Sequence, residues 1–183
     1  MTIKTIFLDR DGVINKDTNY LYKIEEFEFT TGIFKMCQYL LSIDYQIIIV
    51  TNQSGIARGY FSENDFQKLT QWMLSQFKIN GVNILDVFHC PHSSDSNCNC
   101  RKPKPGMLIK AQKQYNIDMG NSWMIGDKER DISAAKNAGI KNTILLNGTQ
   151  KIIKSEAEYI IDSLKNTITV SYTHLTLPTT PYV

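Results

Sequence analysis

The stretch TIFLDRDG, residues 5–12, joins a short apolar run to two aspartates that stand two positions apart. Residues 5–8 are typical of a buried strand. In an extended chain, residues i and i+2 point to the same side and the residue between them points away. We therefore predict that the carboxylates of Asp9 and Asp11 face one spot, with Arg10 turned elsewhere. Like charges held this close repel each other unless a cation or a shared proton relieves them, so the pair indicates a functional site.

Apolar runs and helical patterns alternate over the rest of the chain. The strands are predicted at 47–50, 84–88, 123–125, 142–146 and 158–161, and the helices at 33–41, 62–81, 107–115 and 131–138. Ser62, with Asp65 three residues later, is typical of a capping box that opens a helix. The alternation predicts an α/β fold, a Rossmann-like three-layer sandwich with a mainly parallel sheet. Ligands of such sheets bind beyond the carboxyl ends of the strands, where Asp9, Thr51 and Asp127 follow apolar runs.

The bulk composition indicates an ordinary globular protein. The 183 residues, 42% of them apolar, suffice for one domain with a substantial core. The formal net charge of +2 is too small to indicate a nucleic-acid or membrane partner, and no apolar run approaches the roughly 20 residues of a membrane span. The first residues run straight into a strand, so no signal peptide is expected. We predict a cytoplasmic monomer.

The end of the chain differs from the rest. Residues 170–183, VSYTHLTLPTTPYV, are rich in threonine, lack Asp, Glu, Lys and Arg, and hold two of the five prolines. We therefore predict one domain over residues 1–167, followed by a non-native or disordered tail over 168–183. The alternative is an extra edge strand, because Ile168, Val170 and Tyr172 alternate with polar residues.

Four motifs place polar side chains at the predicted strand ends. They are DRDG with Asp9 and Asp11, TNQSG with Thr51 and Asn52, CRKPKPG with Arg101 and Lys102, and GDKERD with Asp127, Lys128 and Asp131. Mg²⁺ takes oxygen ligands, typically one or two carboxylates plus phosphate oxygens of a substrate. Carboxylates and cations at the strand tips therefore predict a Mg²⁺ and phosphate site. One aspartate can attack phosphorus to form an aspartyl phosphate, while the other acts as general acid and base.

A polar loop over residues 90–100, CPHSSDSNCNC, predicts a second metal site. It holds three thiols and an imidazole at the spacing of a tetrahedral structural zinc site: Cys90, His92, Cys98 and Cys100. The loop has little apolar content, so a metal can replace the missing core. Disulfides are the competing interpretation, disfavoured by the reducing compartment and the short spacing. Because Cys100 adjoins Arg101 and Lys102, bound zinc is expected to orient both cationic side chains toward the Mg²⁺ and phosphate site.

In this order the four motifs resemble those of the haloacid-dehalogenase-like phosphohydrolases. Within that superfamily, DRDGVIN, TNQSGIARG, the cysteine loop with CRKPKPGM, and GDKERD are similar to the motifs of the D-glycero-D-manno-heptose 1,7-bisphosphate phosphatases, over about residues 3–165. The resemblance implies a phosphatase that removes the 7-phosphate of this sugar in the synthesis of nucleotide-activated heptose for surface glycans, the lipopolysaccharide core among them.

The resemblance also implies a role for each motif residue. Asp9 is implied as nucleophile and Mg²⁺ ligand, and Asp11 as general acid and base that also binds Mg²⁺ through its backbone carbonyl. Thr51, Arg101 and Lys102 are implied to steady the transferred phosphoryl group, Asp127 to bind Mg²⁺ and Lys128 to contact the substrate. Asp131 is expected to orient Lys128 or a metal-bound water, and the alternative is an ordinary acidic residue in the first turn of a helix.

The spacing of the motifs leaves no room for a separate cap domain. Predicted helices and strands fill the residues between Asp11 and Thr51, and the cysteine loop joins them before Arg101. The pocket is therefore expected to be open and shaped by loops. The candidate substrate-binding residues are Asp17, Thr18, Asn19, Tyr20, Asn52, Gln53, Ser54, Arg58 and Lys128. Such a pocket suits a small sugar bisphosphate, with Arg58 on the second phosphate; the alternative for Arg58 is a solvated loop arginine.

Other functions remain as alternatives. A histidinol-phosphate phosphatase shares the cysteine loop, although TNQSGIARGYF looks more like the heptose enzymes. A nucleic-acid 3′-phosphatase shares the fold, but the charge balance offers no basic track. A non-catalytic zinc-binding interaction module is the alternative from a different class, and the complete set of acid, base and cations disfavours it. No P-loop or GxSxG motif supports a kinase or a serine hydrolase.

Overall fold

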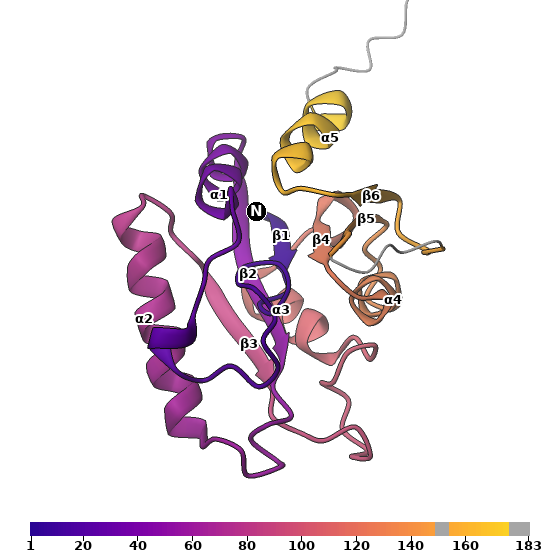
Figure 1. Cartoon of the computed structure of the whole chain (residues 1–183). Helices are drawn as coiled ribbons and strands as arrows, with labels where there is room; N and C mark the ends of the chain where they lie inside the picture. Colours follow the sequence, from indigo (N-terminus) through magenta and orange to yellow (C-terminus); the bar gives the residue numbers. More distant parts are fainter. Residues whose placement is uncertain (149–153, 176–183) are drawn as a thin grey trace, which may run out of the picture.

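The computed structural model describes residues 1–148 and 154–175, with side chains as far as residue 170. Strands and helices alternate along the chain (Figure 1). The strands are β1 (Lys4–Leu8), β2 (Tyr45–Asn52), β3 (Asp86–Cys90), β4 (Trp123–Gly126), β5 (Asn142–Leu146) and β6 (Tyr159–Ile161). The helices are α1 (Ile33–Ser42), α2 (Glu63–Ile79), α3 (Gly106–Tyr115), α4 (Glu129–Asn137) and α5 (Lys165–Leu175), with short 3₁₀ turns at Ile24–Glu26 and Met119–Asn121. Across the described part of the chain, none of the helices has the length and apolar character that a membrane crossing requires.

The described strands form one sheet in which all pairings between them are parallel. The order is β3-β2-β1-β4-β5-β6, so the chain winds outward from β1 first to one side and then to the other. Leu8 of β1 lies opposite Ile49 of β2 and Ile125 of β4. In such a sheet, ligands bind where the winding direction reverses, outside the carboxyl ends of the strands. The topology therefore brings the ends of β1, β2 and β4 to one place, as predicted.

Helices cover both faces of the sheet and create two cores. Ile6 and Leu8 pack with residues of α1 and α2 on one face, whereas Phe7 packs with residues of α3 and α4 on the other. Strands buried on both faces need a continuous apolar sequence, and residues 47–50 of β2 provide it, because all of them are fully buried. The three-layer α/β sandwich is confirmed, and no cap domain interrupts residues 1–148.

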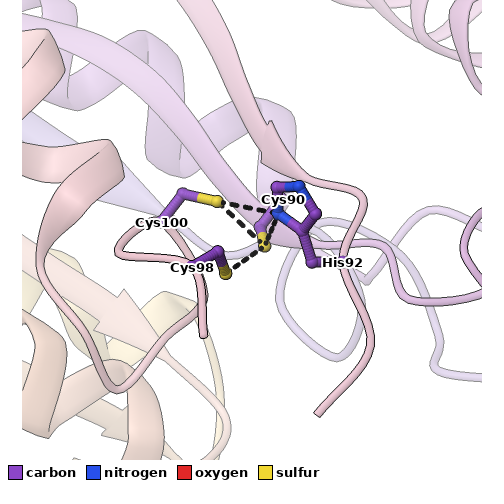
Figure 2. Close-up of side chains that lie close together, drawn as sticks. All are labelled: Cys90, His92, Cys98 and Cys100. Carbon is purple, nitrogen blue, oxygen red and sulfur yellow. Dashed lines mark hydrogen bonds between the residues drawn. The ribbon is translucent and has the colours of Figure 1, made fainter. Parts of the chain in front are cut away.

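The predicted capping box is present, whereas two element boundaries differ from the prediction. Ser62 Oγ accepts a hydrogen bond from the Asp65 N–H at 3.1 Å, and Asp65 accepts one from the Ser62 N–H at 2.9 Å, so the capping box is confirmed. Strand β3 is shifted by two residues from the prediction and ends at Cys90, the first residue of the cysteine loop (Figure 2). Helix α4 begins at Glu129 rather than at residue 131.

The structure describes the end of the chain only in part. Helix α5 contains residues 168 and 170, so the alternative of an edge strand there is wrong. Leu164 and Thr167 are buried and Val170 packs against the core, and this spacing of three residues is helical. Residues 176–183 lie outside the described residues. The domain boundary at 167 and the non-native or disordered tail over 168–183 stay predictions.

Candidate active site and cysteine cluster

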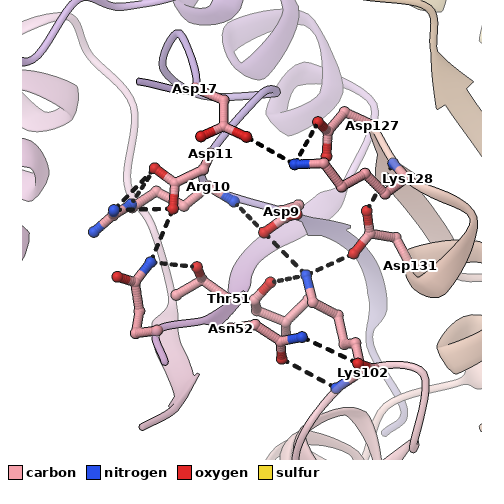
Figure 3. A network of polar contacts seen from close by, with 12 residues as sticks. Asp9, Arg10, Asp11, Asp17, Thr51, Asn52, Lys102, Asp127, Lys128 and Asp131 are labelled. Atoms are coloured by element: carbon pink, nitrogen blue, oxygen red, sulfur yellow. Dashed lines mark hydrogen bonds and ion pairs between the residues drawn. The ribbon is translucent and has the colours of Figure 1, made fainter. Parts of the chain in front are cut away.

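Asp9 lies at the carboxyl edge of the sheet, immediately after β1 (Figure 3). Its N–H donates to the carbonyl of Ile125 at 3.0 Å, so the pairing of β1 with β4 fixes its backbone. The residue is only 3% exposed. Its Oδ1 accepts a hydrogen bond from the Arg10 N–H at 2.7 Å and lies 2.9 Å from Lys102 Nζ. The carboxylate is therefore oriented through Oδ1, which leaves Oδ2 for another partner.

Lys102 carries its ammonium group into the centre of this site. Lysine is rarely buried, yet this residue is 2% exposed. Nζ lies 2.9 Å from Asp9 Oδ1 and 2.7 Å from Asp131 Oδ1, and it donates to the carbonyl of Val50 at 2.8 Å. Burial opposes the charged form, but the two adjacent carboxylates raise the pKa of Lys102 above its usual value. The site thus contains a fixed positive charge beside Asp9.

Asp127 follows β4, and two glycines leave room for the carboxylates around Asp9. A Cβ at Gly12 would overlap the Asp127 carboxylate, and a Cβ at Gly126 would overlap Asp131. Gly12 also has a φ of 89°, which favours glycine. One carboxylate oxygen from each of Asp9, Asp127 and Asp131 lies within 4.8 Å of the others. Asp127 Oδ1 is buried and has no hydrogen-bond partner.

The electrostatics of these carboxylates favour a bound cation. Burial and the neighbouring charge of Asp131 raise the pKa of Asp9 to about 7. The same two causes raise the pKa of Asp127 to about 6. Crowded, desolvated carboxylates disfavour each other's charged forms, and a hard cation with oxygen ligands relieves this. The all-oxygen donor set and the unpartnered Oδ1 of Asp127 therefore fit Mg²⁺.

The side chain of Asp11 has different partners, and the prediction for Arg10 is wrong. Arg10 Nη2 lies 2.9 Å from both carboxylate oxygens of Asp11, and Nε donates to Oδ1 at 3.1 Å. Asn15 Nδ2 at 3.0 Å and Gln53 Nε2 at 2.9 Å also donate to this carboxylate. The reason is that β1 ends at Leu8, so strand alternation does not extend to Asp11. Donors surround the Asp11 carboxylate, and 22% of its side chain is exposed.

The end of β2 supplies a hydroxyl and two amide side chains. Thr51 is 1% exposed, and its Oγ1 accepts a hydrogen bond from Gln53 Nε2 at 2.8 Å. The same amide nitrogen donates to Asp11, so Gln53 links the two residues. Asn52 instead contacts the main chain of Lys102: it donates to the carbonyl at 3.1 Å and accepts from the N–H at 3.0 Å. The TNQSG motif is therefore connected to DRDG through Gln53 and Asp11, and to CRKPKPG through Asn52 and Lys102.

The loop over residues 16–22 lies beside the site and is tied to it by an ion pair. Lys128 Nζ lies 2.7 Å from Asp17 Oδ2 and 3.4 Å from Asp127 Oδ2 (Figure 3). The hydrogen bond with Lys128 lowers the pKa of Asp17 despite partial burial, which opposes it. In the same loop, Tyr20 makes an edge-to-face contact with Tyr60, with ring centroids 4.7 Å apart. The loop that carries Tyr20 therefore contacts the segment that follows Arg58.

The other predicted side chains lie at the edge of this network. Arg101 Nη1 donates to the carbonyl of His92 at 3.2 Å, so the guanidinium contacts the cysteine loop rather than Asp9. Arg58 is exposed, and its charge contributes to the lowered pKa of Asp95, which is due first to a hydrogen bond from Ser93. Thr18 and Asn19 are exposed and Ser54 is half-buried. Their contacts with substrate stay predictions.

The ligand-type side chains of the cysteine loop converge on one point (Figure 2). Cys90 Sγ lies 3.1 Å from Cys100 Sγ and 3.7 Å from Cys98 Sγ. His92 Nδ1 lies 3.5 Å from the sulfur of Cys90 and 3.2 Å from that of Cys100. Sulfur ligands at about 2.3 Å from a tetrahedral Zn²⁺ are roughly 3.8 Å apart, whereas a disulfide bond is about 2.05 Å long. All of these cysteines are free, so the cluster fits a metal and not disulfides.

The cysteine cluster adjoins the carboxylate site through the sheet. Cys90 ends β3 opposite Asn52 of β2, and its carbonyl accepts a hydrogen bond from the Gln53 N–H at 2.8 Å. Lys104 Nζ donates to the carbonyl of Cys98 at 2.7 Å, which ties the loop to the turn after Lys102. The cluster therefore holds the segment that carries Lys102 into the site.

Sequence reasoning missed Asn15 and misjudged Arg10. Both are buried, and Arg10 also donates to the carbonyl of Leu21 at 3.0 Å. The available signal was a polar asparagine after the apolar pair VI, because a buried polar side chain needs a partner. Asp131 was expected to orient Lys128; its carboxylate accepts a hydrogen bond from the Lys128 main-chain N–H at 3.1 Å, while its other oxygen contacts Lys102.

Known proteins match this chain in sequence and in fold. A family model described as HAD-hydrolase-like matches residues 99–167. D-glycero-alpha-D-manno-heptose-1,7-bisphosphate 7-phosphatase of Campylobacter jejuni is 52% identical over 151 residues, which cover 82% of this chain and 87% of that protein. D-glycero-beta-D-manno-heptose-1,7-bisphosphate 7-phosphatase of Pasteurella multocida is 45% identical, with 88% and 92% covered.

A solved structure gives the same result. The D,D-heptose 1,7-bisphosphate phosphatase of B. bronchiseptica, complexed with magnesium and phosphate, is 30% identical and superposes with a TM-score of 0.84. The match covers 93% of this chain and 99% of that protein. The sequence relatives and the structure agree over nearly the whole length, so the chain belongs to the heptose-1,7-bisphosphate 7-phosphatase family of the HAD-like hydrolases.

Proposed function

We propose that this protein is a Mg²⁺-dependent phosphatase that removes the 7-phosphate of D-glycero-D-manno-heptose 1,7-bisphosphate. The observation that carries the proposal is the position of Asp9 at the sheet edge, between the buried ammonium of Lys102 and the carboxylate of Asp127. Two relatives named for this substrate are 52% and 45% identical. The reaction serves the synthesis of nucleotide-activated heptose for surface glycans such as the lipopolysaccharide core. The enzyme acts as a cytoplasmic monomer.

In the first step, Asp9 Oδ2 attacks phosphorus and the bond from phosphorus to the sugar oxygen breaks, which yields an aspartyl phosphate. Asp11 gives its proton to the departing sugar oxygen. Lys102 Nζ lies beside Asp9, so its positive charge acts on the phosphoryl oxygens. The Thr51 hydroxyl at the end of β2 donates to these oxygens, and so does the Arg101 guanidinium once it leaves the carbonyl of His92.

In the second step, water attacks the aspartyl phosphate. Asp11 takes a proton from this water, the bond between phosphorus and Asp9 breaks, and inorganic phosphate leaves. The donors from Arg10 and Gln53 hold the Asp11 carboxylate during both steps. Its partly exposed side chain can exchange protons with the ligand and with water.

Two metals complete the proposed enzyme. Asp9, Asp127 and the backbone carbonyl of Asp11 would hold Mg²⁺, and Asp131 supports the site through Lys102. Bound Mg²⁺ offsets the repulsion between the carboxylates and the anionic phosphate. Cys90, His92, Cys98 and Cys100 would hold Zn²⁺ in a closed shell that stabilises the loop.

The rim loops are proposed to select the sugar. They contribute Asp17, Thr18, Asn19, Tyr20, Gln53, Ser54 and Arg58, together with Lys128 from the start of α4. No cap domain covers this edge in residues 1–148, which suits a small substrate. Arg58 is exposed on its loop and is assigned to the second phosphate.

The test is a comparison of substrates with the purified protein. Both anomers of the heptose bisphosphate, and histidinol phosphate, are incubated with Mg²⁺, and the products are followed by phosphorus NMR. We expect one equivalent of phosphate per heptose bisphosphate, with the anomeric phosphate retained, and much slower release from histidinol phosphate. No release from either anomer, or faster hydrolysis of histidinol phosphate, would refute the proposed function.

A further inference from the structure

Strand β2 contacts both the ammonium group and the main chain of Lys102. The ammonium group donates to the carbonyl of Val50, and the main chain is bound by Asn52, the last residue of the same strand. Asn52 Oδ1 accepts from the Lys102 N–H at 3.0 Å, and Asn52 Nδ2 donates to the Lys102 carbonyl at 3.1 Å (Figure 3). Two such bonds imitate the pairing that a residue of a neighbouring strand makes, although Lys102 lies in no strand.

These contacts use half of the hydrogen-bonding capacity of the Asn52 amide, and both go to the main chain of Lys102. The oxygen accepts one bond, and one of the two N–H groups is engaged. A residue that binds substrate directly needs donors or acceptors that face the ligand. The two observed contacts connect Asn52 to Lys102, whereas its predicted contact with substrate stays a prediction.

The ammonium group of Lys102 depends on the position of its main chain. The side chain has a flexible four-carbon stem, yet Nζ reaches Asp9 and Asp131 within 2.9 Å. The cysteine cluster fixes Cys100 on one side, and the Asn52 contacts act on Lys102 itself. Without the Asn52 contacts, the Cα of Lys102 would vary in position. Its ammonium group would then lose its fixed distance to the carboxylates of Asp9 and Asp131.

We propose that Asn52 is a positioning residue, which fixes the main chain of Lys102 so that its ammonium group stands beside Asp9. This inference rests on the proposed function for its kinetic part, because Lys102 is there assigned to the phosphoryl group. Displacement of such a group by about 1 Å reduces a rate by roughly 100-fold.

The kinetic test compares Asn52→Ala, Lys102→Met and the double variant. Asn52→Ala is expected to lower kcat about 10- to 100-fold with a much smaller change in KM. In the Lys102→Met background the same change is expected to have almost no further effect, because a positioning residue acts only through its partner. Fully additive losses, or a higher KM at unchanged kcat, would instead show direct substrate binding and overturn the inference.

Asn137→Ala is the matched control. Asn137 Nδ2 also donates to a carbonyl of this segment, that of Pro103, at 3.2 Å, but the residue is exposed and outside the site. Its loss is expected to leave kcat unchanged. If Asn52→Ala folds poorly, Asn52→Ser takes its place in the test. A serine side chain cannot span both main-chain groups of Lys102, so the same loss of kcat is expected.

Chemical labelling tests the position of Lys102 without turnover. Acetic anhydride reacts with accessible lysines, and peptide mass spectrometry compares Lys102, which is buried, with the exposed Lys104 of the same segment. Labelling of Lys102 relative to Lys104 is expected to rise in Asn52→Ala and not in Asn137→Ala. Unchanged protection overturns the inference whether or not the wild type is active, whereas an inactive wild type refutes only the proposed function.

Discussion

At the residue scale, the carboxylate site depends on two glycines, which have no side chain to fill the space beside the aspartates. Asp127 faces Asp9 because Gly12 has no Cβ, and Asp131 packs against Gly126 for the same reason. Burial, and second the neighbouring charge of Asp131, raise the pKa values of Asp9 and Asp127, so a nearby cation favours their ionised forms. The glycines therefore contribute to function through the space that they leave.

Gly12→Ala is expected to raise the Mg²⁺ concentration needed for activity about tenfold or more, because the new Cβ would displace the Asp127 carboxylate. The positive φ adds a loss of about 1–2 kcal/mol of stability. Gly81→Ala is the matched control, since Gly81 has a φ of 70° but a Cβ there meets nothing within 4 Å. Initial rates titrated with Mg²⁺, and urea unfolding, give both quantities. Equal Mg²⁺ dependence in the two variants would contradict the steric explanation.

At the element scale, the strands and their ends could be predicted from the sequence, but the directions of side chains beyond them could not. Apolar runs locate β1, β2 and β4, and parallel topology then places Asp9, Thr51 and Asp127 together. The contact of Arg10 with Asp11 arises in the turn after β1, where strand periodicity no longer applies. Such contacts depend on loop conformation, for which local patterns give no rule.

The cysteine loop is an element with almost no core of its own. Its metal-type cluster lies between the end of β3 and the segment that carries Lys102. Its spacing was predictable because metal ligands recur at fixed short separations. The Asn52 contact with Lys102 was not, because it joins residues far apart in the chain.

Cys98→Ser is expected to remove bound Zn²⁺, lower the melting temperature and weaken phosphate binding together, because the segment before Lys102 loses an anchor. Zinc content by atomic emission, thermal unfolding and phosphate titration measure the three effects. Cys37→Ala is the control: this buried cysteine belongs to α1, so its loss lowers stability through packing while zinc and phosphate binding persist. Phosphate affinity unchanged in zinc-free Cys98→Ser would contradict the coupling.

At the scale of the whole molecule, one sheet edge collects groups from distant parts of the sequence. The winding order places β1 between β2 and β4, so the Asp9 carboxylate, the Thr51 hydroxyl and the Asp127 carboxylate meet at one sheet edge. No cap domain interrupts the chain within residues 1–148. The cysteine loop, which follows β3, leads into the segment that places Lys102 beside Asp9. The family relatives cover nearly all of this arrangement, in agreement with a single catalytic unit.

The most direct test of the account is to identify the residue that carries the phosphoryl group during turnover. The enzyme is mixed with heptose bisphosphate and Mg²⁺, quenched in acid within the first turnovers and mapped by peptide mass spectrometry, with Asp9→Asn as the control. We expect a phosphoryl group on Asp9 in the wild type and neither adduct nor turnover in the variant. A phosphoryl group on any other residue, or sustained turnover by Asp9→Asn, would contradict it.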